Sequence, residues 1–322
     1  MEYCLYDPLC GYYTTKAKVF GPEGDFYTSP YTHPLFAEVL GDALGSYLAA
    51  VGGEAELHLV ELGSGEGKLG GDVLGRLENH HPEIFARLTY LPVEVGRSPL
   101  PQEFRGVVFS NEFFDALPVH RVRVRGGELR EVYVRFESEL EEVEGELSDP
   151  RILEYMRSGF AEWREGYDYE VNLNMMETIE DLDRQFESGF VVTIDYGYQW
   201  KDYAASERPE GTLMCYHRHT AHPDPYINIG QQDITAHVNF EVLGKTGERL
   251  GWRGSDLKSQ RQFLREWGLE ARLMEKENRE VLKAAQLEEL LGLKRLLLPG
   301  GVSDTMKVLV QSVRTDSGRP RF

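Results

Sequence analysis

The sequence predicts an α/β fold with a doubly wound, mostly parallel sheet at its centre. Three observations lead to this class. Short apolar runs recur at 57–62, 90–94, 107–110 and 190–194, and several end at an acidic or polar residue. A glycine-rich turn follows the first run, and residues with helical spacing follow the turn. Continuous apolar runs are typical of parallel strands covered by helices on both faces, and the order strand, glycine turn, helix begins a nucleotide-binding unit.

Residues 1–56 are expected to form an N-terminal arm and a helix ahead of the core. The arm, residues 1–34, is rich in Tyr, Gly and Pro, and its aromatic side chains favour an ordered, irregular segment over disorder. From Pro34 onward, apolar residues recur at helical spacing. This pattern predicts an amphipathic helix over 34–51 with proline in its first turn.

Residues 57–120 are expected to form the ligand-binding core. The stretch LVELGSGEGKL, residues 59–69, places Gly63, Gly65 and Gly67 at alternate positions after a strand. Glycine adopts positive φ without strain and, lacking a Cβ, lets a ligand lie against the backbone. A dinucleotide fingerprint requires Gly-x-Gly-x-x-Gly, but Lys68 occupies the position of its third glycine. The spacing is instead similar to motif I of class I S-adenosylmethionine (SAM) methyltransferases, although such a turn can also serve strand–helix packing alone.

Two further strands are expected in this core. Residues 90–94 predict a strand that ends in Glu94, and in doubly wound folds a carboxylate at this point accepts the ribose hydroxyls. Residues 107–110 predict a third strand, followed by the run from Asn111 to Pro118. The link between them is too short for the helix, strand and helix that a methyltransferase of this class usually carries there. We therefore expect either a trimmed sheet or a segment missing from the sequence.

Residues 121–189 are expected to form a hairpin and helical insertion on the substrate side. Alternating residues flank Gly126-Gly127 over 122–134, which predicts a hairpin. The Glu-rich run 137–148 is expected to be a solvated loop or edge, and residues 150–188 are expected to be mainly helical.

Residues 190–322 are expected to complete the core. Residues 190–197 predict a buried strand with Asp195 near its end, and 305–311 predict a last strand. Residues 198–240 show little periodicity and predict a long cleft loop. Residues 256–296 predict helices broken near two glycines, Gly268 and Gly292.

Composition and charge narrow the class of partner. The formal charge of −19 over 322 residues repels nucleic acid and is more compatible with a basic partner. The three cysteines form no metal-binding pattern, nor do His217, His219, His222 and His237, so no metal is expected. No run approaches the ~18 apolar residues of a membrane span, and no secretory or transit segment is visible. We therefore expect a cytoplasmic protein without membrane insertion.

A series of motifs gives nearly the whole chain a resemblance to one family. In chain order they are LYDPLCGYY, GDFYTSP, LVELGSGEGKLGGDVL, NEFFDALPVHR, VVTIDYGY, IGQQDITAHVNFEVL and SQRQFLREWGL. Together they resemble the MidA family of SAM-dependent methyltransferases, which includes a mitochondrial protein arginine methyltransferase of complex I assembly. The resemblance implies SAM as cofactor and, as substrate, an arginine of a protein partner such as a respiratory-complex subunit. The chain departs from the family pattern at Tyr31, where Glu is usual, at Ser64, where Pro is frequent, and in the short link between Glu94 and Val107.

The predicted fold and the family resemblance together indicate which residues form the site. Cofactor contacts are expected from the glycine turn and the strand ends, at Glu61, Gly63, Gly65, Gly67, Glu94 and Asn111. Three residues of the arm are expected to close over the methionine end of SAM: Asp25, Thr28 and Ser29. Glu112 resembles the first glutamate of the loop that holds the guanidinium group in arginine methyltransferases, and Asp115 and His237 are the other catalytic candidates. A helix cap or ion pair is the structural alternative for Glu112, and a loop role is the alternative for His237.

Three other functions stay open beside protein arginine methylation. A small-molecule methyltransferase would use the same fold, and turnover of a metabolite would identify it. A non-catalytic assembly factor would retain SAM binding without transfer. A nicotinamide oxidoreductase is disfavoured by the glycine spacing.

Overall fold

The computed structural model describes residues 1–15, 34–95, 99–205, 207–254, 257–279 and 302–315. The chain divides into two compact units. The core unit comprises Thr28–Phe113, Asp181–Tyr196 and Gly247–Phe322, and the insertion unit comprises Met1–Tyr27, Phe114–Glu180 and Gly197–Thr246. The predicted cofactor residues Asp25, Thr28 and Ser29, and the departure at Tyr31, lie outside the described residues.

The core unit is built on a mostly parallel sheet, which confirms the predicted Rossmann-like α/β class. Its strands run in the order β13-β14-β8-β3-β1-β2. The strands β1 (Leu57–Leu62), β2 (Leu88–Val93), β3 (Phe104–Asn111) and β8 (Phe186–Tyr198) pair in parallel. The sheet ends on antiparallel β14 (Met306–Val313) and β13 (Lys258–Ser259). The parallel arrangement brings the carboxyl ends of β1, β2, β3 and β8 to one edge, where ligands bind in such folds.

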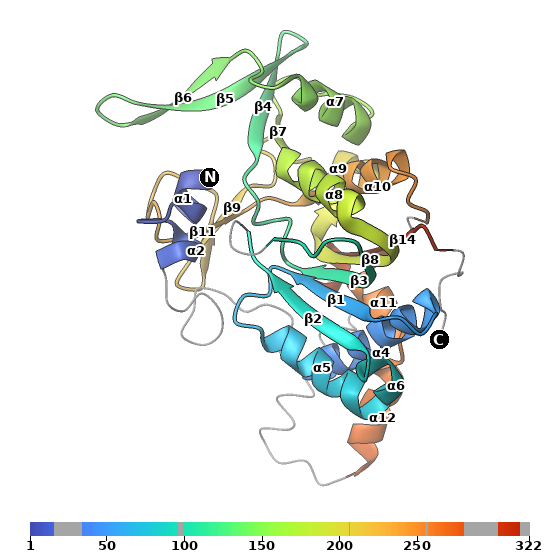
Figure 1. Ribbon diagram of the computed structural model, residues 1–322. Helices are drawn as coiled ribbons and strands as arrows, with labels where there is room; N and C mark the ends of the chain where they lie inside the picture. The colour runs from blue at the N-terminus through green and yellow to red at the C-terminus, as the bar shows by residue number, and fades with distance from the viewer. Residues whose placement is uncertain (16–33, 96–98, 206, 255–256, 280–301, 316–322) are drawn as a thin grey trace. The chain divides into compact units, whose positions relative to one another are not determined.

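Helices pack against this sheet and bury its apolar strands. They are α4 (Pro34–Val51), α5 (Lys68–His80), α6 (Pro82–Phe85), α11 (Gln260–Glu266), α12 (Leu269–Arg279) and α14 (Val302–Thr305). Figure 1 shows α4, α5, α6 and α12 grouped beside β1 and β2. One continuous core joins apolar side chains of α4 and α5 to those of β1, β3, β8 and β14.

The helix α4 has the bounds that the sequence predicts, and its apolar composition is explained by packing. By length and composition this helix could cross a membrane, but 67% of its 18 residues are buried within the protein. Gly41 and Gly45 lie where α4 meets the end of α5: a Cβ at Gly41 would be 2.8 Å from the Arg76 side chain, and one at Gly45 would be 2.7 Å from the His81 ring. The two glycines therefore allow close helix packing.

Among the described residues the sheet ends at β2 on one side. Strands β2 and β3 both pair with β1, on its opposite sides. In the described part of the chain no strand lies beyond β2, and the link from Glu94 to Glu103 contains no helix. The described residues thus lack the additional helices and strand on this side, as both alternatives predict.

The insertion unit contains a four-stranded antiparallel sheet in the order β6-β5-β4-β7. The predicted hairpin forms from β4 (His120–Arg125) and β5 (Glu128–Phe136), joined by Gly126-Gly127 at φ +59° and +79°. The carboxylate of Glu165 accepts hydrogen bonds from both glycine N–H groups, at 2.9 and 3.0 Å. The Glu-rich run forms β6 (Leu140–Gly145), so it is an edge strand rather than a loop.

Residues 150–188 are only partly helical, so that prediction is wrong in its middle. The helices are α7 (Pro150–Gly159) and α8 (Leu173–Gln185), and between them lies β7 (Asp168–Val171), which pairs with β4. The β-propensity of its residues does not reveal β7, because this strand is stabilised by pairing with a strand about 45 residues away.

The expected long loop over 198–240 is largely ordered, which corrects that prediction. It contains α9 (Trp200–Ala205) and a small sheet of β9 (Met214–His217), β10 (Thr220–His222) and β11 (Asp233–Thr235). The short strand β12 (Val238–Asn239) pairs with the last two residues of β8, and α10 (Phe240–Arg249) follows it.

The start of the N-terminal arm consists of two short helices, α1 (Glu2–Tyr6) and α2 (Tyr12–Thr15). Leu5 and Tyr12 form a small core with Cys215 and Ile234 of the small sheet. The Tyr13 hydroxyl donates to Asp233, at 2.7 Å. The described start of the arm, residues 1–15, is ordered because its aromatic rings pack against the small sheet.

Candidate functional site

The glycine turn connects β1 to α5 at the carboxyl edge of the core sheet. Gly63, Gly65 and Gly67 have φ of +72°, +55° and +73°, so each lies in the left-handed region that favours glycine. At Gly63 a Cβ would also be 2.7 Å from the Phe113 ring. At Gly67 a Cβ would meet nothing within 4 Å, so only the backbone conformation requires glycine there. The turn therefore exposes backbone at the start of α5.

Glu94 is joined to this turn by two hydrogen bonds. The Ser64 hydroxyl donates to Oε1 of Glu94 at 2.8 Å, and the Gly65 N–H donates to the same oxygen at 2.7 Å. Gly63 N–H donates to the carbonyl of Val93, the last residue of β2, at 2.8 Å. The carboxylate is thus fixed through one oxygen. Sequence analysis noted Ser64 only as a departure from a pattern and missed this contact, because the partner lies thirty residues away.

Glu61 lies beneath the turn, inside the unit. It is 3% exposed, and the Tyr90 hydroxyl donates a hydrogen bond to its carboxylate. A Cβ at Gly70 would collide with both side chains, so this glycine of α5 makes room for the pair. Burial raises the pKa of Glu61 to about 7; the Tyr90 hydrogen bond opposes the rise, and the negative charge of Glu94 adds to it. Sequence analysis did not identify Tyr90 or Gly70.

Asn111 and Glu112 follow β3 at the same edge of the sheet. Oδ1 of Asn111 is buried and has no hydrogen-bond donor among the described residues, while its Nδ2 donates to Oε1 of Glu112 at 3.2 Å. Glu112 has φ +54°, a conformation that is uncommon for a residue with a side chain. Its N–H donates to the carbonyl of Ile194 in β8, at 2.9 Å.

Asp195 holds the turn that contains Glu112. This aspartate is fully buried at the end of β8. Its carboxylate accepts hydrogen bonds from the N–H of Phe113 at 3.2 Å and from that of Tyr196 at 2.8 Å. The backbone on either side of Glu112 is therefore anchored to β8, which stabilises the left-handed conformation. Such strained residues cluster at functional sites.

The other two catalytic candidates belong to the insertion unit. Asp115 is 5% exposed, and its carbonyl accepts a 2.9 Å hydrogen bond from the N–H of Ala236, the residue before His237. The N–H of His237 donates to the hydroxyl of Thr212 at 3.0 Å. Burial lowers the pKa of the His237 imidazole to about 4, and the positive charge of Arg208 adds to this effect. The ring is therefore neutral at pH 7. Glu112 lies in the core unit, so the three candidates are divided between the two units.

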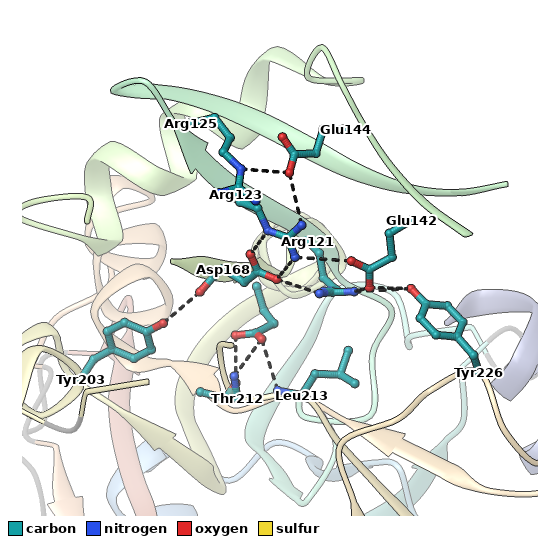
Figure 2. Close-up of polar contacts among 11 residues, drawn as sticks. Arg121, Arg123, Arg125, Glu142, Glu144, Asp168, Tyr203, Thr212, Leu213 and Tyr226 are labelled. Carbon is teal, nitrogen blue, oxygen red and sulfur yellow. Dashed lines mark hydrogen bonds and ion pairs between the residues drawn. The ribbon is translucent and has the colours of Figure 1, made fainter. Parts of the chain in front are cut away.

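A charge network covers one face of the antiparallel sheet (Figure 2). Arg121 and Arg123 of β4 both donate to Asp168 of β7, each at 2.7 Å, and also pair with Glu142 of β6. Two residues further along β7, the buried carboxylate of Glu170 accepts hydrogen bonds from the N–H and the hydroxyl of Thr212, at 2.8 and 3.0 Å. These buried carboxylates have their hydrogen-bond donors within the unit, so the network is a structural support of the sheet rather than a ligand site.

The parallel sheet, the turn after β1 and the carboxylate after β2 define a Rossmann-like class I SAM-dependent methyltransferase. The chain belongs to the family described as "Putative S-adenosyl-L-methionine-dependent methyltransferase", which matches residues 39–99 and 96–256. The two matched stretches meet at the short link after β2. The residues at this edge of the sheet fit this cofactor in kind, because the Glu94 carboxylate and the unpaired Asn111 Oδ1 are hydrogen-bond acceptors and the cofactor carries hydroxyl and amino donors.

Similar proteins include mitochondrial enzymes. The chain is 28% identical over 329 residues to the human protein arginine methyltransferase NDUFAF7, mitochondrial, with 85% of this chain and 70% of that protein covered. It is 26% identical over 299 residues to the Drosophila melanogaster homolog, with 78% and 66% covered. The chain thus spans about two thirds of the length of these relatives. The expectation of a cytoplasmic protein is wrong, because these relatives and the one from Caenorhabditis elegans are named as mitochondrial.

A solved structure supports the cofactor. A protein from Burkholderia thailandensis, crystallised with S-adenosyl-homocysteine bound, is 27% identical and superposes with a TM-score of 0.83. The alignment covers 98% of this chain and 87% of that protein.

Proposed function

We propose that this protein transfers a methyl group from SAM to an arginine side chain of a protein partner. The observation that carries the proposal is Glu112, a carboxylate held in the left-handed region at the carboxyl edge of the sheet. The names of the mitochondrial relatives support arginine as the acceptor. A subunit of a respiratory complex is the partner that we favour.

The chemistry of methyl transfer asks little of the protein beyond positioning. SAM supplies a methyl group that its sulfonium already activates, so the protein must align the acceptor nitrogen and exclude water. A guanidinium group is planar and cationic, and a carboxylate binds it through paired hydrogen bonds. We assign this role to Glu112. Asp115 and His237 remain catalytic proposals; the imidazole of His237 is neutral, and because its pKa is lowered to about 4 it would position a group rather than take up a proton.

We assign the cofactor contacts to the core unit. Gly63, Gly65 and Gly67 would present backbone to SAM, and Glu94 would accept the ribose hydroxyls through the oxygen that Ser64 and Gly65 leave unused. Asn111 Oδ1 would accept a donor of the cofactor. Glu61, being buried, would support the turn from below.

The remaining assignments concern domains and partners. We propose that 57–120 contain the SAM-binding core, that 1–56 form an arm and a helix ahead of it, and that 121–189 form the substrate side. Of residues 190–322, the parts that belong to the core unit, 190–196 and 247–322, complete the core. A net charge of −19 favours a basic protein partner over nucleic acid. We also propose that α4 is a core helix without membrane insertion, because most of its surface is covered by its own unit.

The experiment combines binding and transfer. Wild-type protein and Glu112→Gln are titrated with SAM by calorimetry and incubated with labelled SAM and mitochondrial protein extract, followed by mass spectrometry. We expect arginine methylation by the wild type. For Glu112→Gln we expect nearly unchanged SAM affinity and at least ~100-fold slower transfer, about 2.7 kcal/mol of transition-state stabilisation.

Other outcomes would redirect the assignment. Labelled metabolites without labelled proteins would indicate a small-molecule methyltransferase. SAM binding without any transfer would indicate a non-catalytic assembly factor. Lost SAM affinity in Glu112→Gln would move Glu112 to the cofactor site, and normal transfer by this variant would remove it from the acceptor site.

A further inference from the structure

The outer strand of the antiparallel sheet has an open edge. Among the described residues β6 pairs only with β5, so its other side presents backbone N–H and C=O groups along Leu140–Gly145. Such an edge is a template for a further strand from another polypeptide. Figure 1 shows the turn between β5 and β6 reaching away from α7.

Exposed apolar side chains lie beside this edge. Val134 and Phe136 of β5 are 52% and 71% exposed. In the register of β5 and β6, Phe136 is opposite Leu140 and Val134 is opposite Glu142. Since residues directly opposite each other point to the same side of a sheet, these side chains lie on one face. An incoming strand would therefore find both backbone partners and an apolar contact at the same place.

The charge of the edge is of one sign. Between Ser138 and Asp149 the chain contains no Lys or Arg but five exposed glutamates: Glu139, Glu141, Glu142, Glu144 and Glu146. The arginines of β4 pair with Glu142 and Glu144 (Figure 2), and Arg135 pairs with Glu141. Glu139 and Glu146 form no ion pair with any described residue.

We propose that the β6 edge docks a basic, extended segment of the protein substrate, which adds as a further strand and places Lys or Arg side chains against these glutamates. Charge complementarity selects this occupant. A second copy of the chain is disfavoured, because pairing of β6 with β6 would place glutamates opposite glutamates. The identity of the partner as substrate rests on the proposed function, but docking itself requires no methyl transfer.

The test measures docking directly. The probe is a fluorescent peptide of about ten residues that alternates Arg and Val. A matched peptide carries backbone N-methyl groups at alternate positions, which keep its charge but block strand pairing. Fluorescence anisotropy gives the Kd of the full chain for each peptide. We expect the N-methylated peptide to bind at least ~10-fold more weakly, because main-chain hydrogen bonds supply part of the affinity.

Two charge-reversal variants locate the site. Glu139→Lys/Glu141→Lys/Glu146→Lys alters the edge. Glu54→Lys/Glu78→Lys/Glu83→Lys makes the same change of net charge at exposed positions of the core unit. We expect the edge variant to bind the unmodified peptide at least ~10-fold more weakly than the wild type, and the control variant less than ~3-fold more weakly. Both variants should retain wild-type affinity for S-adenosylhomocysteine, which establishes that the core unit is folded, and a wild-type circular dichroism spectrum, which establishes that the antiparallel sheet is retained.

Three results would overturn the proposal. Absence of peptide binding to the wild type would leave the acidic edge as a protection against aggregation only. Equal loss of peptide affinity in both variants would indicate that the overall negative charge of the protein attracts the peptide. Equal affinity for the unmodified and the N-methylated peptide would exclude strand addition. Methyl transfer is not measured, so failure of the arginine assignment would leave these results unchanged.

Discussion

The hydroxyl group of Ser64 lies 2.8 Å from Oε1 of Glu94, and this contact joins the glycine turn to the end of β2. The Gly65 N–H donates to the same oxygen. The carboxylate is therefore oriented by the turn itself before a ligand arrives, and the ligand need not order it. In the assignment proposed above, Ser64 is a positioning residue for the ribose acceptor.

Loss of the Ser64 hydroxyl should weaken cofactor binding. We expect Ser64→Ala to raise the Kd for SAM and for S-adenosylhomocysteine alike, by about 3- to 10-fold, because one hydrogen bond contributes about 1 kcal/mol. Calorimetry with both ligands measures the effect. Ser64→Thr keeps a hydroxyl and should restore most of the affinity. Equal Kd values for wild type and Ser64→Ala would show that Glu94 needs no help from the turn.

Substitution of Gly65 should abolish SAM binding in a folded protein. At φ +55° a β-branched residue is strained, and its side chain would occupy the surface left to the ligand. We expect Gly65→Val to raise the Kd for SAM more than ~100-fold.

Gly71, in the first turn of α5, provides the matched control for Gly65. A Cβ at Gly71 would meet nothing within 4 Å, and its backbone is helical. Gly71→Ala should retain SAM affinity and gain about 0.5–1 kcal/mol of stability. A folded Gly65→Val variant that binds SAM like the wild type would exclude the turn from the cofactor site.

The parts of the fold that depend on local pattern could be predicted from the sequence. The bounds of α4 and β1, and the presence of α5 after the glycine turn, follow from apolar spacing and from glycine and proline, which act on their neighbours. Contacts between distant segments could not be predicted. Asp195 holds the N–H of Phe113 from 82 positions away, and this contact depends on the register of β8 against β3. The pattern thus indicated Glu112 but not the support that fixes it.

Glu61 should make stability depend on pH. Its pKa is about 7 in the folded protein against 4.5 as the ordinary value, so between these pH values the folded state binds more protons than the unfolded state. The contribution of Glu61 to the free energy of unfolding therefore falls as pH rises from about 4.5 through about 7. The loss is complete above that pH and amounts to about 3 kcal/mol.

Glu61→Gln removes this titration while keeping the shape of the side chain. Urea unfolding at pH 5 and pH 8 should show a smaller loss of stability for the variant than for the wild type, with the difference on the order of 2–3 kcal/mol. Comparison of the two proteins cancels the other titrating groups. Parallel pH dependences would mean that Glu61 is ionised in the folded state at pH 5.

Replacement of Glu112 by glycine should raise the free energy of unfolding above that of the alanine variant and should also abolish methyl transfer. The residue has φ +54°, where a side chain costs about 1–2 kcal/mol and glycine does not. Glu112→Ala is the control, because it also removes the carboxylate but retains the Cβ and hence the strain. We expect Glu112→Gly to be more stable than Glu112→Ala by about 1 kcal/mol in urea unfolding. Both should lose at least ~100-fold in arginine methylation. The strain is kept, in this view, because it holds the carboxylate where the acceptor binds. Equal stability of the two variants would show that the turn relaxes once the side chain is gone, and full activity of either would separate the strained conformation from catalysis.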